Sequence, residues 1–183
     1  MVQKEFLRKK YFIKRKKNYF AIKENFFNPL IKLLKKKFKK KISIALYYPT
    51  AYELNVLGIF DKESSKKFRF LLPVIDEKNS MNFYDWKKGD ILIVNRYGIL
   101  EPTKTKLKVP EVILVPLLAY DKNNNRLGYG KGFYDRYLNK LKNKANKILT
   151  IGIAFSFQKH HNLPNNNKDY KLDYILTEKG LNN

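Results

Sequence analysis

Short apolar runs separated by polar, Lys-rich stretches constrain the fold of this chain more than any other feature. Most of these runs are apolar throughout, which is typical of strands buried on both faces of a parallel sheet. Helical patterns lie between them. The alternation predicts an α/β fold: a three-layer, mostly parallel sheet flanked by helices, with further helices at the N-terminus. The predicted strands are residues 42–48, 68–72, 91–94, 112–118, 148–155 and 174–177.

The first 41 residues are predicted to be helical. Apolar residues recur at roughly helical spacing from residue 4 to residue 27, which indicates one or two amphipathic helices. Asn28 and Pro29 then suit the N-cap and first turn of another helix that runs through Phe38. A short helix that includes Glu53 and a helix over residues 134–141 are also expected. The 183 residues show no repeat or linker, so we expect a single domain over residues 1–183.

Composition excludes several classes of protein. The chain has no cysteine, which excludes disulfides, thiolate metal sites and a cysteine nucleophile. Hydrophobic residues make up 44% of the chain and aromatic residues 15%, enough for a packed globular core. No apolar stretch approaches the roughly 20 residues of a membrane span, and no signal-peptide core is present. We therefore expect a cytoplasmic protein without a membrane partner.

The formal net charge of +23 raises the alternative of a polyanion partner. Residues 1–41 carry +14 of this charge, so the excess lies mainly in the predicted N-terminal helices. Only six of the 39 basic residues are Arg, although Arg is the side chain best suited to bidentate phosphate and guanine contacts. This composition favours solvated surface lysines over nucleic-acid binding.

The segment RLGYGKGFYDR, residues 126–136, lies between a predicted buried strand and a predicted amphipathic helix. Glycine tolerates positive φ and lets the backbone approach a ligand, so N–H groups of the loop and helix N-terminus can bind anionic oxygens. Lys131 and Arg126 would add positive charge. The spacing matches neither the Walker A loop nor the dinucleotide-binding fingerprint. On glycine content alone, a flexible strand-to-helix turn is an equally good interpretation.

A more specific interpretation comes from a longer match. Residues 116–138, PLLAYDKNNNRLGYGKGFYDRYL, resemble the signature of the 5-formyltetrahydrofolate cyclo-ligase family, also called methenyltetrahydrofolate synthetases. Other segments are similar in the expected order, so the resemblance spans nearly the whole chain. A basic residue is common in the family where Tyr129 stands, and a His often stands in place of Lys168. The other similar segments are residues 4–8, 98–102, 152–158, 163–164 and 173–178, together with Glu53 and Asp169.

The resemblance implies an ATP-dependent enzyme that converts 5-formyltetrahydrofolate to 5,10-methenyltetrahydrofolate. ATP is the co-substrate and Mg²⁺ the metal ion; ATP phosphorylates the formyl oxygen, N10 attacks the activated carbon, and ADP and phosphate are released. Phosphorylation is needed because an amide-like formyl oxygen is a poor leaving group. Catalysis then depends mainly on positioning and on neutralising phosphate charge.

The resemblance also implies roles for individual residues. Lys131 and Arg126 are the expected catalytic residues, and Asp135 and Asp169 the expected Mg²⁺ ligands. Glu53 is expected to accept hydrogen bonds from the pterin, because its carboxylate matches the pterin's N–H donors. The loop residues Tyr129, Gly130, Lys131, Gly132 and Phe133 are expected to contact the folate as well. The expected ATP contacts are Lys4, Arg8, Arg126, Leu127, Gly128, Tyr129, Gly130, Lys131, Gly132, Phe133 and Tyr134.

Without the resemblance, the same charged residues have simpler interpretations. Lys4 and Arg8 would be solvated charges on one helical face, and Glu53 and Asp135 acids that stabilise helix N-termini. Asp169 would lie in an ordinary turn. His160 and His161 have no third ligand or nucleophile beside them, and we assign them no catalytic role.

Two other functions stay open. The first is a nucleic-acid-binding protein on the same domain that uses the basic N-terminal helices, and the second is a sugar-phosphate enzyme of similar sheet topology. We expect a monomer. The basic surface would favour folates with a polyglutamate tail through electrostatic attraction.

Overall fold

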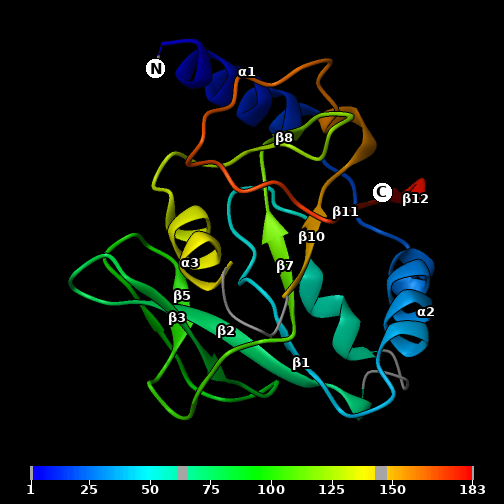
Figure 1. Ribbon diagram of the computed structural model, residues 1–183, viewed down its shortest axis with the longest axis vertical. Coiled ribbons are helices and arrows are strands. Elements are labelled where there is room, and N and C mark those ends of the chain that lie inside the picture. The colour runs from blue at the N-terminus through cyan, green and yellow to red at the C-terminus, as the bar shows by residue number, and fades with distance from the viewer. Residues whose placement is uncertain (1, 62–65, 143–147, 183) are drawn as a thin grey trace.

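The computed structural model describes residues 2–61, 66–142 and 148–182, and within them eight strands form one sheet in the order β12-β11-β10-β7-β1-β2-β3-β6 (Figure 1). The five central strands, β11, β10, β7, β1 and β2, run parallel to one another. β12, β3 and β6 join the two edges as antiparallel strands. The bounds are β1 Ser43–Ala45, β2 Arg69–Ile75, β3 Met81–Asp85, β6 Leu107–Lys108, β7 Val112–Pro116, β10 Leu149–Ile153, β11 Tyr174–Thr177 and β12 Gly180–Asn182.

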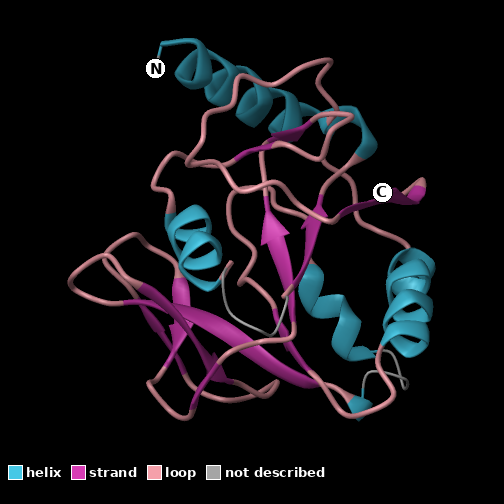
Figure 2. Cartoon of the chain, viewed as in Figure 1, coloured by secondary structure: helices cyan, strands magenta, loops and turns pink. Residues whose placement is uncertain are grey.

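Two hydrophobic cores lie on the two faces of the sheet. Ile44 and Ala45 are neighbours in β1, and because successive side chains in a strand point to opposite faces they belong to different cores. The helix α2 (Asn28–Lys37) and the 3₁₀ helices η1 (Glu24–Phe27) and η2 (Val56–Asp61) cover one face. The helix α3 (Phe133–Leu141) covers the other face (Figure 2). The predicted three-layer α/β fold is therefore confirmed.

The helix α1 (Val2–Asn18) crosses the end of the sheet toward which β7 points, which is the carboxyl end of the parallel strands (Figure 1). Leu7 and Tyr11 of α1 form a third hydrophobic cluster with Leu118, Leu127 and Leu163. Two hairpins lie near this end, β8 (Ala119–Tyr120) with β9 (Arg126–Leu127) and β4 (Leu92–Val94) with β5 (Leu100–Pro102). A further 3₁₀ helix, η4, spans Ser156–Gln158.

The N-terminal region is less helical than predicted. α1 ends at Asn18, residues 19–23 are not helical, and α2 ends at Lys37, where Phe38 takes up an extended conformation. Tertiary packing explains the first break, because the rings of Tyr19 and Phe20 lie 5.8 and 4.7 Å from that of Phe155. Packing against a distant segment therefore outweighs the local helical spacing.

Several predicted strands differ from the observed ones: β1, β7 and β10 are shorter than predicted, and two others differ in extent or burial. β2 continues through Pro73 to Ile75. The backbone nitrogen of Pro73 faces the side of β1, but the pairing of β2 with β1 ends at Leu71. The N–H group that proline lacks would therefore have made no hydrogen bond in the sheet. Residues 91–94 were predicted as a buried strand, which is wrong. β4 lies in the separate hairpin with β5, and Ile91 just before it is 77% exposed.

The helix predicted around Glu53 is also wrong. The 3₁₀ helix η2 begins only at Val56, and Glu53 lies in the loop that precedes it. Ala51 and Tyr52 have φ values of 43° and 65°. A residue with a Cβ atom adopts such positive φ values only at a cost in free energy. The backbone before Glu53 is therefore a strained turn and not a helix N-terminus.

Candidate active site

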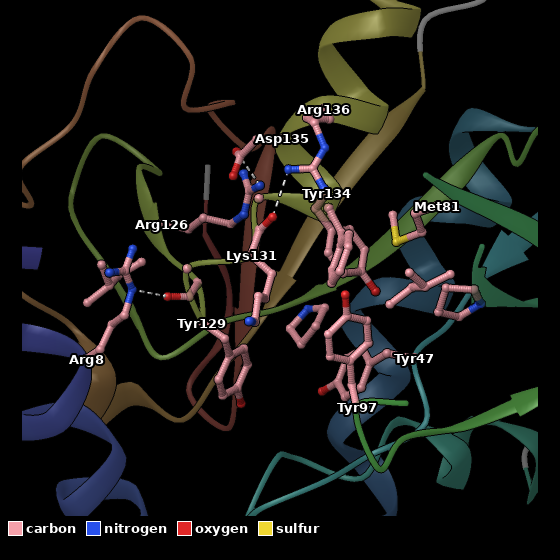
Figure 3. Close-up of a pocket in the computed structure, with 18 of the residues that line it drawn as sticks. Arg8, Tyr47, Met81, Tyr97, Arg126, Tyr129, Lys131, Tyr134, Asp135 and Arg136 are labelled. Atoms are coloured by element: carbon pink, nitrogen blue, oxygen red, sulfur yellow. Dashed lines mark hydrogen bonds and ion pairs between the residues drawn. The ribbon is translucent and has the colours of Figure 1, made fainter. Parts of the chain in front are cut away.

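A pocket of about 1440 Å³ opens at the carboxyl ends of the parallel strands (Figure 3). In open α/β sheets this edge is the usual position of a ligand site. All the residues that the resemblance assigns to ATP, folate or metal line this one pocket. They come from α1, from the loop after β1, from β9, from the glycine-rich loop at residues 128–132, from α3 and from the loop before β11. The predicted residues in the lining are Lys4, Arg8, Glu53, Arg126, Leu127, Gly128, Tyr129, Gly130, Lys131, Gly132, Phe133, Tyr134, Asp135 and Asp169.

The glycine-rich loop is held against α1 by Arg8. Arg8 Nε donates a hydrogen bond to the Gly128 carbonyl oxygen at 3.0 Å. Gly130 has a φ of 98°, and a Cβ atom built there would lie 3.1 Å from the Arg8 guanidinium carbon. Both the backbone conformation and the approach of Arg8 therefore require glycine at position 130.

The loop leads into the N-terminus of α3. Gly132 is the N-cap residue in the left-handed conformation, and Phe133 and Tyr134 form the first turn and line the pocket. The first N–H groups of a helix have no partner within the helix, and the helix dipole places positive potential at this end. Loop and helix together have the properties of an anion site.

Arg126 and Asp135 form an ion pair at the base of this loop. Arg126 Nη2 lies 2.5 Å from Asp135 Oδ1, and Nη1 donates to the Tyr170 carbonyl oxygen at 2.5 Å. The backbone N–H of Tyr170 also donates to Asp135 Oδ1, at 2.9 Å. The Arg126 side chain is only 4% exposed, so in this structure it anchors the loop and α3 to the segment around Tyr170.

Lys4 and Asp169 form a second ion pair, across the mouth of the pocket. Lys4 Nζ lies 2.5 Å from Asp169 Oδ2, which also accepts a hydrogen bond from the Asn166 N–H at 2.8 Å. Lys4 and Asp169 are 165 residues apart in the chain. The pair joins the N-terminal turn of α1 to residues 166–169.

Lys131 lies at the tip of the glycine-rich loop. Figure 3 shows its side chain reaching into the pocket toward Tyr129. Its Nζ atom lies 5.6 Å from the centre of the Tyr97 ring, a cation–π distance. The residue is exposed, so its ammonium group can meet an anion that enters the pocket.

Glu53 is buried, and its carboxylate accepts three hydrogen bonds, one of them from the Thr50 hydroxyl to Oε2 at 3.2 Å. Tyr129 Oη donates to Glu53 Oε1 at 2.6 Å, and the Thr50 N–H donates to Glu53 Oε2 at 2.8 Å. Only 7% of Glu53 is exposed, and this burial raises the pKa of its carboxyl, while the hydrogen bonds and the Arg15 charge oppose the rise. The carboxylate keeps unused lone pairs for further donors.

The two predicted metal ligands, Asp135 and Asp169, suit a metal that is bound mainly through a ligand's phosphates. Among the described residues, no group of three or more His, Cys, Asp or Glu side chains is placed to hold a metal ion. Mg²⁺ usually takes one or two carboxylates together with substrate phosphates and water. Both aspartates line the pocket, and each is already paired with a cation, Arg126 or Lys4.

The structure also places the residues that were assigned no chemistry. His160 Nδ1 lies 2.9 Å from Tyr11 Oη, so this histidine contacts α1 outside the pocket. Among the aromatic residues, Phe83 and Trp86 are buried in the cores, whereas Tyr48 lines the pocket, as does Tyr134, an expected ATP contact.

Two pocket features were missed from the sequence. Arg15 is 1% exposed, and its guanidinium contacts the Tyr129 hydroxyl behind the pocket wall. Tyr97, whose ring lies beside the Lys131 ammonium group, also lines the pocket. Arg15 lies in the basic run of residues 14–17, where nothing local separates it from solvated lysines.

Within the described ranges, no helix is long and apolar enough to cross a bilayer.

The comparisons with known proteins all indicate one family. A 5-formyltetrahydrofolate cyclo-ligase of Mycoplasma genitalium is 35% identical over 135 residues, which cover 73% of this chain and 71% of the relative. One of Haemophilus influenzae is 32% identical over 144 residues, which cover 73% of this chain and 74% of the relative.

The solved structures agree with these relatives. The NMR structure of the Aquifex aeolicus 5,10-methenyltetrahydrofolate synthetase matches with a TM-score of 0.73 and 35% identity, over 97% of this chain and 91% of that chain. The nucleic-acid alternative finds no support in these comparisons. The 5-formyltetrahydrofolate cyclo-ligase family model matches residues 3–178, and the chain therefore belongs to this family.

Proposed function

We propose that the pocket formed by α1, the loop before η2 and the glycine-rich loop is where this cyclo-ligase closes 5-formyltetrahydrofolate to 5,10-methenyltetrahydrofolate with ATP. One observation carries the proposal: segments from both ends and the middle of the chain bring all the predicted site residues to one pocket. Scattered solvated charges would have no reason to converge in this way.

The ATP phosphates bind at the glycine-rich loop and the N-terminus of α3. The support is the left-handed Gly132 at the N-cap, the exposed ammonium of Lys131 and the nearby cations Lys4 and Arg8. Phosphoryl transfer needs little covalent help from the protein, so these groups act by positioning the γ-phosphate and neutralising its charge.

The pterin binds at Glu53. The carboxylate is held in place by Tyr129 and Thr50, which supply three hydrogen bonds, and it keeps an acceptor site for an N–H or NH₂ donor of the pterin. A ligand that satisfies a buried carboxylate in this way gains a charge-assisted hydrogen bond.

The reaction then proceeds in two steps. The formyl oxygen attacks the γ-phosphorus, an O–P bond forms, and the bond to the departing ADP breaks. N10 next attacks the formyl carbon and loses its proton, and the C–O bond breaks as the oxygen leaves with phosphate. Lys131 serves the first step, because its charge balances the negative charge on the transferring group.

Asp135 and Asp169 would hold Mg²⁺ together with the ATP phosphates. The metal would supply charge neutralisation at the β- and γ-phosphates. Each aspartate is paired with a cation in this structure, so holding a metal would require the Arg126–Asp135 and Lys4–Asp169 pairs to open. Lys4 in particular is then free to move from Asp169 to a phosphate oxygen.

The first test follows the near-ultraviolet absorbance of the conjugated methenyl product in a mixture of protein, Mg²⁺, ATP and 5-formyltetrahydrofolate. We expect an increase that requires ATP and that is much slower with Lys131→Ala. A mixture with EDTA tests the metal separately. If folded protein gives no absorbance change with either substrate in excess, the proposed reaction is wrong.

Several finer statements stay predictions: one domain over residues 1–183, a monomer, a cytoplasmic location and a preference for polyglutamylated folates. The last is supported by the net charge of +23, which attracts a polyanionic tail.

A further inference from the structure

Arg15 is a buried cation that joins three segments around the pocket. It lies on α1 and is 1% exposed. Its Nη2 atom donates to the Ala51 carbonyl oxygen at 2.8 Å and to the Tyr129 hydroxyl at 2.6 Å, and Nη1 donates to the Leu117 carbonyl oxygen at 3.3 Å. A charge this deeply buried is costly unless it is paired.

The pairing runs through Tyr129 to Glu53. A guanidinium has only donors, so the Tyr129 hydroxyl must accept from Arg15 and is free to donate its own proton to Glu53 Oε1, at 2.6 Å. The result is a directed chain from Arg15 through Tyr129 to Glu53. Tyr129 as a whole is 41% exposed although its hydroxyl makes both buried contacts, so the tyrosine ring forms part of the pocket wall.

Arg15 also holds the strained turn that carries Glu53. The contact at Ala51 is to the first of the two positive-φ residues that directly precede Glu53. Such conformations cost free energy and persist only where the surroundings hold them. Arg15 therefore acts on Glu53 from two sides, through the backbone of its loop and through the Tyr129 hydroxyl.

We propose that Arg15 is a positioning residue for folate binding, holding the Glu53 carboxylate in place for the pterin and supplying the positive charge that balances it. The inference rests on the proposed function, in which Glu53 receives the pterin. It assigns to α1 a part in folate binding in addition to the expected phosphate contacts of Lys4 and Arg8.

The proposal has a pH consequence. The titratable and charged groups that face Glu53 are Arg15 from α1, Tyr47 after β1, Tyr129 from the glycine-rich loop and Tyr134 from α3. Burial raises the pKa of all three tyrosines, so they stay neutral and Arg15 is the charged member of this group. Burial also raises the pKa of Glu53, so the ionised form is lost as the pH falls through that value. Removing Arg15 raises the pKa of Glu53 further, because the Arg15 charge opposes the effect of burial.

The test compares Arg15→Met, Arg15→Lys and Tyr129→Phe, with Lys17→Met as the control that removes an exposed charge from the same helix. The KM values for 5-formyltetrahydrofolate and for ATP are measured across pH. For Arg15→Met we expect the folate KM to rise about tenfold, the size of one lost charge-assisted hydrogen bond. The acid limb of folate binding, that is, the pH range in which binding weakens as Glu53 becomes protonated, should move up by about one pH unit. Arg15→Lys should restore part of that shift, and the KM for ATP should change little.

Tyr129→Phe keeps the inference testable if Arg15→Met does not fold, because it removes one hydroxyl and leaves the Arg15 contacts to Ala51 and Leu117. It should raise the folate KM and move the acid limb in the same direction. Wild-type KM and pH behaviour in Tyr129→Phe and in any folded Arg15 variant would overturn the proposal.

Glu53→Gln separates this inference from the proposed function. If Glu53→Gln raises the folate KM while the Arg15 and Tyr129 variants do not, only the positioning role is lost. If Glu53→Gln also leaves the folate KM unchanged, the pterin does not bind at Glu53, and both the inference and the proposed placement fail. ATP-dependent turnover by the wild-type protein is the positive control in each case.

Discussion

At the scale of single residues, the pocket combines two kinds of charge. Arg126 and Arg15 are buried and hold other groups in position, whereas Lys131 is exposed at the tip of a loop. A buried guanidinium with several fixed partners loses them if it moves, so it suits a structural role. A flexible lysine with an accessible ammonium suits contact with a phosphate that arrives and leaves. The following predictions separate these roles.

Lys131→Ala should lower kcat by about two orders of magnitude, the usual cost of removing one donor to developing negative charge. The substitution is at an exposed position, so the melting temperature should hardly change. Lys122→Ala, at an exposed lysine in the turn between β8 and β9, is the matched control and should retain wild-type kcat. Equal losses in the two variants would remove Lys131 from the phosphate site.

Gly130→Ala should impair ATP binding as well as stability. Adopting positive φ costs a residue with a Cβ about 1–2 kcal/mol, and the new atom would displace Arg8 from its place beside the loop. Gly89→Ala is a control of matched strain, because Gly89 has a φ of 100° and a Cβ there would meet no other atom within 4 Å. Thermal unfolding should show a similar loss in both variants, whereas only Gly130→Ala should raise the KM for ATP.

At the scale of elements, α1 forms one wall of the pocket. It contributes Lys4, Arg8 and Arg15, yet its hydrophobic contacts are limited to the small cluster around Leu7 and Tyr11. Its docking therefore depends on this cluster, on the Lys4–Asp169 ion pair and on the hydrogen bonds of Arg8 and Arg15. Weakening that cluster should release α1 while the two cores of the sheet stay intact.

Leu7→Ala should destabilise the docked helix by about 2–5 kcal/mol, the range for removing a buried leucine side chain. Hydrogen exchange of α1 should then become faster and the KM for ATP should rise, while exchange of β7 and β10 stays slow. Phe6→Ala is the control from the adjacent position, because Phe6 is 65% exposed. If Leu7→Ala leaves both exchange and KM unchanged, α1 is not held by this cluster.

The elements show how much of the structure can be predicted from the sequence. Continuous apolar runs mark the central strands, because strands buried on both faces need apolar residues throughout, and the glycine-rich loop marks the proposed phosphate site. β3 was missed because Met81 and Phe83 are buried while Asn82 and Tyr84 are only partly so, a weak alternating pattern. Arg15 was missed because its partners Ala51, Leu117 and Tyr129 come together only in the fold.

At the scale of the whole molecule, the chain that forms the proposed anion site carries a net charge of +23. A positive field of this size raises the local concentration of negatively charged ligands and speeds their association. The effect acts between exposed charges and is screened by salt, unlike the buried contacts at Glu53. The contribution of the exposed charges to folate binding can therefore be distinguished from that of the buried contacts by varying the ionic strength.

Five glutamates on the folate tail should lower the KM relative to the monoglutamate at low ionic strength, because each added carboxylate meets the positive field. Between about 0.01 M and about 1 M salt the Debye length falls from about 30 Å to about 3 Å, so the ratio of the two KM values should approach one. The KM for the monoglutamate should change less, since its pterin is held by buried contacts. Both folates are assayed through the methenyl absorbance at saturating ATP. Equal KM values at low salt would mean that the basic surface plays no part in folate selection and that the lysines are solvated charges, the simpler interpretation of the composition.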